Sequence, residues 1–426
     1  MIDPKLIREN PEFVKENLKK RQDPQVLKLV DEFLEVDKKK REIETKINKL
    51  RHERNEASRK VAELKKKGAN ATKEIKKMGQ ISDEIEKLQT KLEKYKTELD
   101  EILYKIPNLL HETVPFGKDE HDNVEIRRWG SPPKFDFEPR GHLELAMQLN
   151  LLDRDRAAKV AGHGFYYIKG KLVLLDLALI RFAIDELIKK GYSLVEPPFM
   201  LNERAYRGAE DFEFLRDQAY KIEGDDLFLI GTAEHPLATM FMNETLLKGQ
   251  LPMKFIGVSP CFRREVGSHG KYTKGLYRMH HFNKIEMFVI SKPEESWQIF
   301  EQVQGDAEEL FQKLGLHYRV VNVCTGDIGY KAAKKYDIEA WMADGKFREI
   351  GSNSNCTDYQ ARALNIKYRE KEGQTPAGFV HMINNTAIAT SRTMITIMEQ
   401  YQQRDGTIKI PKVLWKYTGF KKIERQ

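Results

Sequence analysis

Three groups of charged and polar residues in the second half of the chain have the types and spacing of a site that binds a polyphosphate. The first group places Arg263, Arg264 and Glu265 before a glycine-containing loop, residues 266–275, and Phe282 after it. Two strands joined by such a loop would bring arginines to a polyphosphate and an aromatic ring to a nucleobase. A charged hairpin on the protein surface is the alternative interpretation.

The other two groups supply oxygen ligands and a further arginine. Residues 347–355, Phe-Arg-Glu-Ile-Gly-Ser-Asn-Ser-Asn, end a predicted strand with acidic, hydroxyl and amide groups, which are hard oxygen ligands for Mg²⁺. A polar strand end without a ligand is the alternative there. Residues 382–397 run from a polar turn into a helix that carries Arg392 among apolar neighbours. Such an arginine requires a buried anion or a carboxylate partner.

These groups need a scaffold, and from about residue 135 the sequence predicts a mixed domain of strands and helices. Residues 297–314 have the 3.6-residue apolar period of an amphipathic helix. Four short β-rich runs are Leu227 to Ile230, Lys254 to Val258, Ile285 to Ile290 and Tyr318 to Val323. We find neither a regular βαβ alternation nor a GxGxxG or Walker-type loop. We therefore expect the α+β class, with an antiparallel β-sheet flanked by helices.

The N-terminal quarter carries two hydrophobic heptad seams, which predict a long antiparallel α-helical coiled-coil hairpin over about residues 26–103. In the first seam Val26, Phe33, Ile47 and Val61 alternate with Leu29, Val36, Ile43, Leu50, Ala57 and Leu64. The second seam runs from Met78 to Ile102. Between them, residues 67–72 form a turn in which Thr72 is a candidate helix cap. At 1.5 Å per residue, each arm would be about 50–60 Å long.

Charge is concentrated on the first arm. Residues 38–67 contain 13 Lys and Arg against 5 Asp and Glu, so they carry a net charge equal to the +8 of the whole chain. Such a run attracts polyanions, including nucleic acid, although a solvated helix face has the same composition. We expect an N-terminal hairpin domain at 1–106, an irregular proline-containing linker at 107–134 and a catalytic domain at 135–426.

The three cysteines, Cys261, Cys324 and Cys356, lie far apart and form no CxxC pair. Their spacing indicates neither a disulfide framework nor a zinc site and fits a reducing, cytoplasmic compartment. The first residues are interspersed with charges, and the best apolar run, residues 172–180, is too short to span a bilayer. We expect no signal peptide and no association with a membrane.

Taken together, these features resemble the seryl-tRNA synthetases over essentially the whole chain. That family carries the three signature motifs of class II aminoacyl-tRNA synthetases. Gly191 to Pro198 looks like motif 1, the dimerisation element, while Phe262 to Glu286 matches motif 2 and Asn384 to Arg392 matches motif 3. The triplet Thr232-Ala233-Glu234 also matches a short serine-site signature.

The resemblance implies a role for each residue that matches a motif. The catalytic residues would be Arg263, at the α-phosphate and the amino-acid carboxylate, Glu265, at the adenine amino group, and Arg392, at the γ-phosphate. Phe282 would stack under the adenine. ATP, which is a substrate, would be bound by Arg263, Arg264, Glu265, Met279, Phe282, Glu349, Ile350, Gly351, Ser352 and Arg392. The resemblance also implies that Glu349 and Ser352 bind Mg²⁺, and we expect no zinc.

The resemblance also implies a serine pocket, an RNA surface and a subunit interface. The pocket would be formed by Thr232, Ala233, Glu234, Arg263, Glu286, Asn384 and Thr386. The hairpin would bind tRNA(Ser) across a homodimer formed through motif 1. Its candidate RNA contacts are Arg41, Arg51, Arg54, Arg59, Lys60 and Lys65. Arg54 interrupts the first seam, so it could instead fix the helix register.

The implied reaction is the activation of serine with ATP to seryl-adenylate plus pyrophosphate, followed by transfer to the 3′ end of tRNA(Ser). Charging of tRNA(Sec) stays open. In-line attack on the α-phosphate requires fixed cations and no covalent nucleophile, so we interpret His235, His269, His280 and His281 as structural or peripheral.

A non-catalytic RNA-binding paralogue of the same fold is the rival interpretation. Such a protein usually loses the motif arginines, and this chain has them. Two departures from the family pattern stand at the site itself. Gly351 replaces a common serine, and His235 replaces a common aliphatic residue. Each substitution affects the expected geometry of the site around it, but neither removes a proposed ligand.

Overall fold

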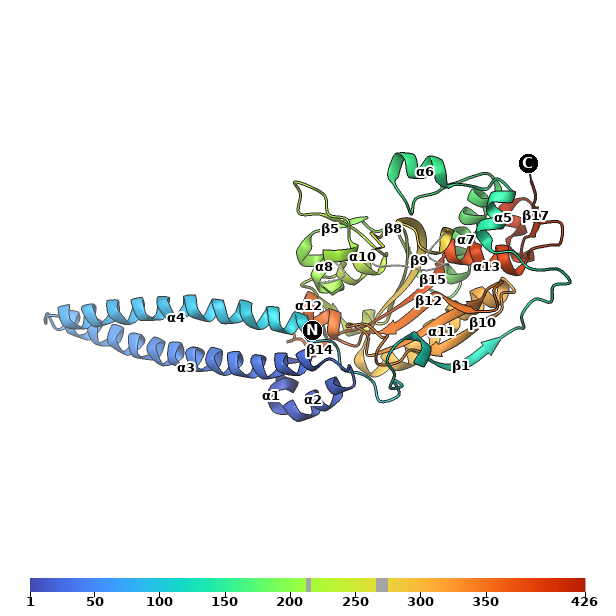
Figure 1. The fold of residues 1–426 in the computed structure, drawn as a ribbon. Helices are drawn as coiled ribbons and strands as arrows, with labels where there is room; N and C mark the ends of the chain where they lie inside the picture. The colour runs from blue at the N-terminus through green and yellow to red at the C-terminus, as the bar shows by residue number, and fades with distance from the viewer. Residues whose placement is uncertain (212–215, 266–274, 426) are drawn as a thin grey trace. The chain divides into compact units, whose positions relative to one another are not determined.

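A computed structural model describes residues 1–211, 216–265 and 275–425 of the chain (Figure 1). The chain divides into two compact units, Ile2–Pro107 and Asn108–Gln426, the second of which includes Met1. Among the described helices, none is long and apolar enough to cross a lipid bilayer.

The N-terminal unit consists of helices α1 (Pro4–Glu9), α2 (Pro11–Lys19), α3 (Pro24–Lys66) and α4 (Thr72–Lys105). The first three begin in the same way, with an Asp or Asn followed by proline at the first helical position. The side chains of Asp3, Asn10 and Asp23 accept hydrogen bonds from backbone N–H groups of the first turn. Proline costs nothing there because that N–H has no partner within a helix.

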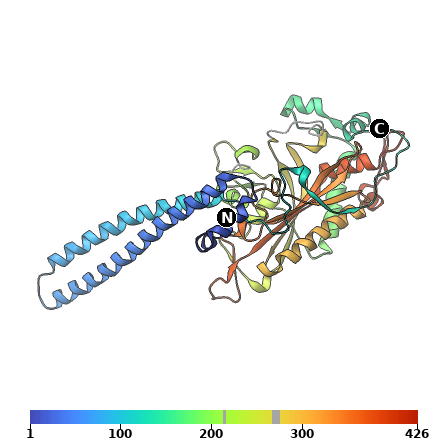
Figure 2. The same cartoon turned by 60° about the horizontal axis from the view of Figure 1, so that its bottom comes forward.

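Helices α3 and α4 form the predicted antiparallel hairpin, and they lie side by side along their length (Figures 1 and 2). Its seam buries Ile47, Leu50, Ile81 and Ile85. The expectation that Thr72 caps α4 is wrong. The N-cap is Ala71, and it is the Asn70 side chain that accepts the Thr72 N–H, at 2.9 Å.

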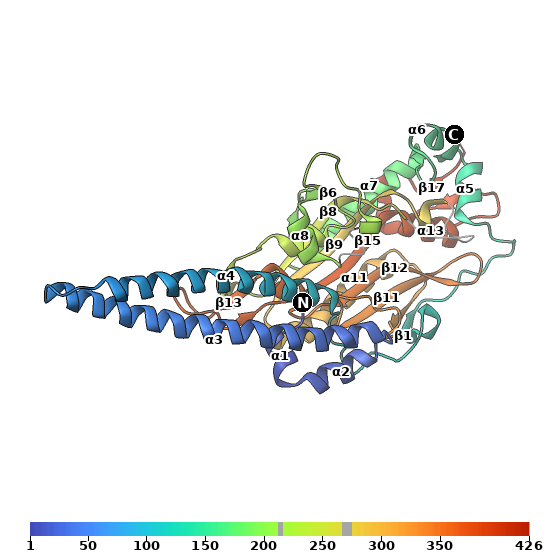
Figure 3. The ribbon, with the colours of Figure 1, turned by 60° about the vertical axis from the view of Figure 1, so that its left-hand side comes forward.

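The second unit is built on a sheet whose eight described strands have the order β1-β10-β11-β12-β15-β9-β8-β4 (Figure 3). All neighbours are antiparallel except β4 and β8, which are parallel. The strands are β1 (Val124–Trp129), β4 (Ser193–Val195), β8 (Met253–Phe262), β9 (His281–Ser291), β10 (Tyr318–Asn322), β11 (Lys334–Trp341), β12 (Phe347–Asn355) and β15 (His381–Ala389). The predicted antiparallel class is confirmed, and β8, β9 and β10 coincide with predicted runs.

Side chains of β9 alternate between two apolar clusters. Ile285, Met287 and Val289 belong to the main core, to which helices α7 (Lys171–Ile188), α11 (Ser296–Lys313) and α13 (Thr390–Gln400) also contribute. Phe288 and Ile290 belong to a smaller cluster with helices α10 (Glu234–Thr239) and α12 (Tyr359–Leu364). Because successive strand residues point to opposite faces, Glu286 faces α10 rather than the main core.

Shorter elements complete the second unit. The helices are α5 (His142–Gln148), α6 (Arg154–Ala161), α8 (Glu203–Ala209) and α14 (Trp415–Thr418). The strands, in four small sheets, are β2 (Leu152–Asp153), β3 (Tyr167–Ile168), β5 (Met200–Leu201), β6 (Phe228–Leu229), β7 (Thr245–Leu247), β13 (Lys367–Arg369), β14 (Gly378–Phe379), β16 (Ile408–Lys409) and β17 (Lys422–Ile423).

One expectation for the linker needs correction. The segment 107–134, expected to be irregular, contains strand β1, which forms the edge of the large sheet. Most of its side chains are exposed, and three of its six residues are charged, so a hydrophobic pattern is nearly absent. Its pairing is decided by β10, and charged residues such as Arg127 and Arg128 are common on edge strands because they discourage pairing with another chain.

Candidate active site

The β8–β9 hairpin places Arg263 and Phe282 on the same side of the sheet. The backbone N–H of Arg263 donates to the carbonyl of His280 at 3.0 Å, and its side-chain Nε donates to the carbonyl of Gly231 at 3.2 Å. The guanidinium carbon lies 5.5 Å from the centre of the Phe282 ring. The structure therefore brings together the arginine and the aromatic ring that the sequence analysis assigned to one nucleotide site.

Glu265 has a backbone φ of +51° and accepts a hydrogen bond from Arg278 at 3.4 Å. A positive φ is unfavourable for a residue with a side chain and is found most often where function requires it. The predicted flexible loop follows directly. Residues 266–274, including His269, lie outside the described residues.

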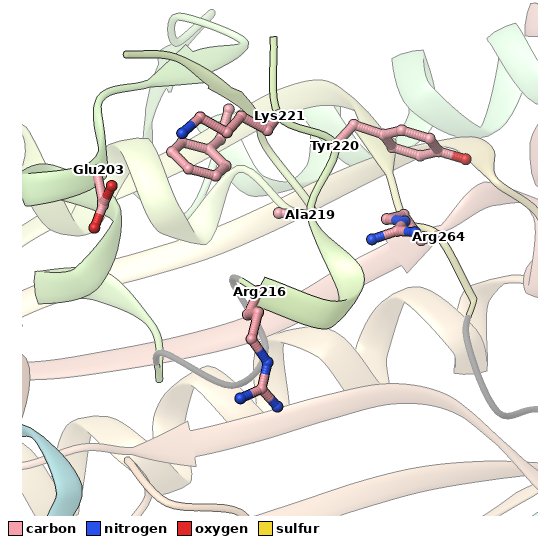
Figure 4. Close-up of a pocket in the computed structure, with 7 residues that line it drawn as sticks. Glu203, Arg216, Ala219, Tyr220, Lys221 and Arg264 are labelled. Carbon is pink, nitrogen blue, oxygen red and sulfur yellow. The ribbon is translucent and has the colours of Figure 1, made fainter. Parts of the chain in front are cut away.

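Arg264 faces a cavity of about 460 Å³ beside the hairpin (Figure 4). Its backbone N–H donates to the carbonyl of Gln218 at 2.9 Å, which ties the end of β8 to the segment that forms the cavity wall. The other lining residues are Glu203, Arg216, Ala219, Tyr220, Lys221 and Phe228. Arg264, one of the predicted ATP-binding residues, therefore lines this cavity.

Arg392 has the carboxylate partner that the sequence analysis required. From α13, its Nη1 lies 3.2 Å from both the carbonyl oxygen and a carboxylate oxygen of Glu349 on β12. Its guanidinium lies 4.7 Å from the centre of the Tyr277 ring, and the Tyr277 hydroxyl also donates to the Glu349 carbonyl at 3.1 Å. Because Glu349 and Tyr277 already hold the Arg392 guanidinium in place, this cation can bind an anion with little further reorganisation.

The charges of this pair are set by their mutual contact. Burial opposes ionisation of Glu349, but Arg392, Lys335 and Arg263 outweigh it and lower the pKa of the carboxyl. Burial likewise opposes the charged form of Arg392, but Glu349 and Tyr277 raise its pKa. Both groups are therefore charged at neutral pH.

The neighbours of Glu349 on β12 explain one departure from the family pattern. Ile350 is fully buried in the main core. Gly351 faces β15, and a Cβ there would lie only 3.2 Å from the carbonyl oxygen of Thr386. Glycine lets the two strands approach closely at this point, and a serine would require a shift of a few tenths of an ångström. Met279 is 5% exposed, with its side chain in the main core.

Oxygen donors suited to a hard cation lie next to this pair. Ser352, three residues beyond Glu349, is paired in register with Asp337 of β11. One carboxylate oxygen of Asp337 is 3.3 Å from Lys335 Nζ, and the other is buried with no hydrogen-bond partner among the described residues. Burial raises the pKa of Asp337 to about 7, although Lys335 opposes this. Sequence reasoning missed Asp337 because only strand pairing brings it to Ser352.

No cluster of three or more His, Cys, Asp or Glu suited to a metal ion occurs within the described ranges. The donors that are present, Glu349, Ser352 and Asp337, still fit a cation that takes oxygen ligands, because such an ion can complete its shell with phosphate oxygens and water.

A second set of buried polar residues lies on the α10 face of the sheet. Thr386 of β15 is in register with Glu286 of β9, and its hydroxyl donates to the Glu286 carboxylate at 3.4 Å. The Glu234 backbone N–H donates to the Thr232 hydroxyl at 3.1 Å at the start of α10. The predicted pocket residues Thr232, Ala233, Glu234, Glu286, Asn384 and Thr386 are all buried, and three separate elements bring them to one face.

Two lysines in this region were not predicted. Lys284 Nζ lies 2.6 Å from the Glu286 carboxylate, and Lys331 Nζ lies 2.7 Å from that of Glu234. Gln360 of α12 also donates to Glu234, at 3.1 Å. Lysine and glutamine are common at protein surfaces, so nothing in their local sequence marks these residues as buried partners of the pocket.

The candidate RNA contacts all lie on α3. Arg51, Arg59, Lys60 and Lys65 are exposed. Arg41 donates to the buried carboxylate of Asp37 at 2.8 Å, so it already has a role within the unit. Arg54, which the seam pattern marked as ambiguous, is half-buried.

Comparison with known proteins identifies the class and the family. Residues 218–401 match the family model of the tRNA synthetase class II core domain (G, H, P, S and T). Together with the antiparallel sheet and the arginines placed on it, this match defines the protein as a class II aminoacyl-tRNA synthetase, an ATP-dependent ligase. Residues 1–110 match the Seryl-tRNA synthetase N-terminal domain. The chain belongs to the seryl-tRNA synthetase family, as the sequence motifs predicted.

Individual relatives cover the chain from end to end. The serine–tRNA ligase of Pyrococcus abyssi is 51% identical over 99% of this chain and 97% of its own length. The structure of the seryl-tRNA synthetase from Pyrococcus horikoshii complexed with ATP matches all of both chains, with a TM-score of 0.95 and 49% identity. The cytoplasmic serine–tRNA ligase from Naegleria fowleri in complex with AMP matches with a TM-score of 0.89 and 33% identity.

Proposed function

We propose that this enzyme activates L-serine with ATP to form seryl-adenylate and pyrophosphate, and then transfers the seryl group to the 3′ end of tRNA(Ser). The observation that carries the proposal is the position of Arg263. Its side chain contacts the Gly231 carbonyl, next to the Thr232–Glu234 triplet, and also the face of Phe282. It therefore connects the amino-acid pocket to the nucleotide side of the site. Serine–tRNA ligases about half identical to this chain, and an ATP-bound relative, support the same reaction.

The chemistry assigned to these residues is positioning and charge stabilisation. The serine carboxylate attacks the α-phosphorus in line with the departing pyrophosphate, and Arg263 holds both the carboxylate and an α-phosphate oxygen. Arg392, oriented by Glu349, holds the γ-phosphate. Fixed cations stabilise the charge that develops on the phosphoryl oxygens, so no covalent nucleophile is needed.

Mg²⁺ is the metal that this donor set would bind. Glu349 and Ser352 would hold it, with the buried oxygen of Asp337 nearby. When bound, the ion would neutralise charge on the ATP phosphates. Glu349 would then serve two partners, the cation and Arg392, and the low pKa of Glu349 supports this role because only the ionised carboxylate can bridge two positive charges.

Selectivity for serine is assigned to the buried polar residues of the pocket. Glu286, Thr386 and Glu234 offer hydrogen-bonding groups that a substrate with an ammonium and a hydroxyl group can satisfy. Alanine, which lacks the hydroxyl, would leave a buried polar group without a partner. Sites of this kind reject the analogue that lacks the polar group strongly.

For the RNA and the quaternary structure, we propose that the exposed cations of α3 bind tRNA and that motif 1 forms a homodimer interface. Large apolar side chains are exposed on α7 and β4, including Leu174, Leu177, Ile188 and Leu194. Leu194 lies within the motif 1 segment, residues 191–198, and Ile188 ends the helix that precedes it. Exposed large apolar side chains near this segment favour a protein partner. The three buried, unpaired cysteines fit a reducing compartment, and we propose that the enzyme works in the cytoplasm.

The first test is amino-acid-dependent exchange of pyrophosphate into ATP by the purified protein, with serine compared against alanine, threonine, cysteine and glycine. Exchange with serine alone would support the activation step, and charging of tRNA(Ser) and tRNA(Sec) transcripts would then define the RNA substrate. A folded protein that exchanges with none of the five would favour the non-catalytic RNA-binding paralogue.

A further inference from the structure

Behind the amino-acid pocket, Glu234 belongs to a buried network of charged side chains whose other members have no role in the reaction described above. Lys331, in the loop before β11, bridges two carboxylates: its Nζ is 2.7 Å from Glu234 Oε1 and also contacts Glu210, the C-terminal cap of α8. The same Glu210 oxygen is 3.2 Å from His235 Nε2. The Lys331 side chain is only 17% exposed, and His235 is completely buried.

The protonation states within this network follow from its contacts. Burial opposes the charge on Lys331, but Glu210 and Glu234 raise its pKa well above the ordinary value, so Lys331 is protonated. Burial also opposes the charge on Glu210, yet Lys331 and His235 hold the pKa of Glu210 below its ordinary value. Burial lowers the pKa of His235, which is therefore neutral at pH 7 and donates its Nε2 hydrogen to Glu210.

Two neighbours of the network, the Cys356 thiol and the Lys284–Glu286 pair, add no net charge to it. Burial raises the pKa of the Cys356 thiol, which is neutral. Lys284 forms an ion pair with Glu286 at 2.6 Å and compensates it. Two carboxylates, those of Glu210 and Glu234, share a single ammonium, that of Lys331, so the network holds one carboxylate more than it holds cations. A buried charge of this kind calls for a cation, and an amino-acid substrate brings one in its ammonium group.

The contacts of Glu234 show where that cation would bind. Both Lys331 and Gln360 approach the same oxygen, Oε1, from different elements. The carboxylate is thereby held in one orientation, and no contact to Oε2 is found among the described residues. Glu234 belongs to the Thr232–Glu234 triplet at the start of α10, so its second oxygen is available to the substrate.

We infer that Lys331, anchored by Glu210 and His235, is a positioning residue that orients Glu234 and leaves the pocket with one uncompensated negative charge for the ammonium group of the substrate. This inference rests on the proposed function, because it assigns a role within the same serine pocket. It also gives a physical reason for His235 at a position where the family commonly has an aliphatic residue. A histidine can donate to Glu210 in a completely buried setting, and an aliphatic side chain cannot.

The test is steady-state ATP–pyrophosphate exchange with the Lys331→Met variant of the full-length enzyme. Without Lys331 the Glu234 carboxylate loses the contact that orients it, and two buried carboxylates without a cation favour their protonated, neutral forms. The KM for serine should therefore rise by at least about tenfold, with little change in the KM for ATP, because only ground-state binding of the amino acid is weakened. Lys331→Arg, which keeps the charge and can bridge two carboxylates, should recover most of the loss. An unchanged KM for serine in folded Lys331→Met enzyme would overturn the inference.

Lys190 provides a matched control. Its Nζ also bridges two carboxylates, at 2.9 Å from Asp306 and 2.5 Å from Glu309, both on helix α11, which contributes to the main core. Lys190→Met should lower the melting temperature without changing the KM for serine. If both methionine variants raise that KM equally, the effect of Lys331 is merely structural and the inference fails.

A second variant keeps the inference testable if Lys331→Met does not fold. Glu210→Gln preserves the shape of the anchor and removes one negative charge, so Lys331 would balance Glu234 completely. The inference predicts a higher KM for serine in Glu210→Gln and a normal KM for ATP, and an unchanged KM for serine would count against it. Absence of serine-dependent exchange in the wild-type enzyme would instead refute the proposed function itself.

Discussion

At the scale of single residues, the site is a set of charges whose positions are fixed before any ligand binds. Arg263 is held by a backbone carbonyl and an aromatic ring, and Arg392 by a carboxylate and a carbonyl of the same residue, Glu349. Side chains ordered in this way need little reorganisation when charge develops on a phosphoryl group, which is where electrostatic catalysis gains most.

Replacing Arg263 by alanine should abolish the activation of serine. The variant removes the cation between the amino-acid carboxylate and the α-phosphate, and we expect the rate of ATP–pyrophosphate exchange to fall by about a hundredfold or more. Arg404→Ala serves as the control, because Arg404 is exposed and pairs with Asp136 at the surface. Full activity in a folded Arg263→Ala enzyme would remove the role assigned to this residue.

At the scale of secondary-structure elements, the site depends on strand pairing. The pair Thr386 and Glu286 exists because β15 and β9 are in register, and the pair Asp337 and Ser352 exists because β11 and β12 are. The edge of the same sheet is secured by His317, which precedes β10. Its ring Nδ1 donates to the carbonyl of Trp129 in β1 at 2.7 Å, and its Nε2 is buried, with no hydrogen-bond partner in the part of the chain that the structure describes.

His317 should make the stability of the enzyme depend on pH. Burial lowers its pKa in the folded state, so the unfolded chain takes up a proton first as the pH falls. The stabilising contribution of neutral His317 is complete above the unfolded pKa of about 6.5 and is lost as the pH falls from there through the folded pKa. His317→Asn can keep the bond to Trp129 but does not titrate. The melting temperature of the wild type should therefore exceed that of His317→Asn by a larger margin at pH 8 than at pH 5.5. An equal margin at both pH values would contradict this assignment.

The α3 arm gives a second prediction at this scale. Replacing Arg51, Arg59 and Lys60 together by alanine should raise the KM for tRNA by about tenfold or more. The slope of the logarithm of the tRNA binding constant against the logarithm of the salt concentration should become less steep by roughly one for each phosphate contact that is lost. ATP–pyrophosphate exchange should not change. The matched control replaces the exposed Lys87, Lys91 and Lys94 of α4, which are not assigned to RNA. If both triple variants raise the KM for tRNA equally, the RNA is attracted by the overall charge of the hairpin and not by this surface of α3.

At the scale of the whole molecule, the two units and the proposed second copy have different assigned roles. The sheet unit carries the residues assigned to activation, and the hairpin unit carries the cations assigned to RNA. Leu174 and Leu177 of α7 are exposed in the single chain. Burying large apolar side chains against a second copy would favour dimerisation by about 1.5–3 kcal/mol for each side chain fully buried.

Leu177→Glu should therefore shift the enzyme from two chains to one. Leu177 is 54% exposed at the centre of α7, and a charge there would be buried without a partner in the dimer. Size-exclusion chromatography with light scattering measures the change directly. Val160→Glu, on the exposed side of α6, should stay dimeric. A wild-type enzyme that runs as a single chain would contradict the proposed interface.

The sequence by itself determined the features that depend on residues close together in the chain. The heptad seams predicted the hairpin of α3 and α4, the 3.6-residue period predicted α11, and the order of residue types in the motifs predicted which arginines belong to the site. These inferences hold because periodicity and motif spacing are properties of consecutive residues.

Tertiary structure decided everything that depends on partners far apart in the chain. The sequence showed that Arg392 needs a carboxylate, but only the pairing of distant strands made that carboxylate Glu349. It left β1 in a linker, because its pairing comes from β10, and it gave no sign that Lys331 reaches Glu234. The sequence does not show whether a charged residue will be buried. A buried charge needs a partner of opposite charge, and only the folded chain brings that partner to it.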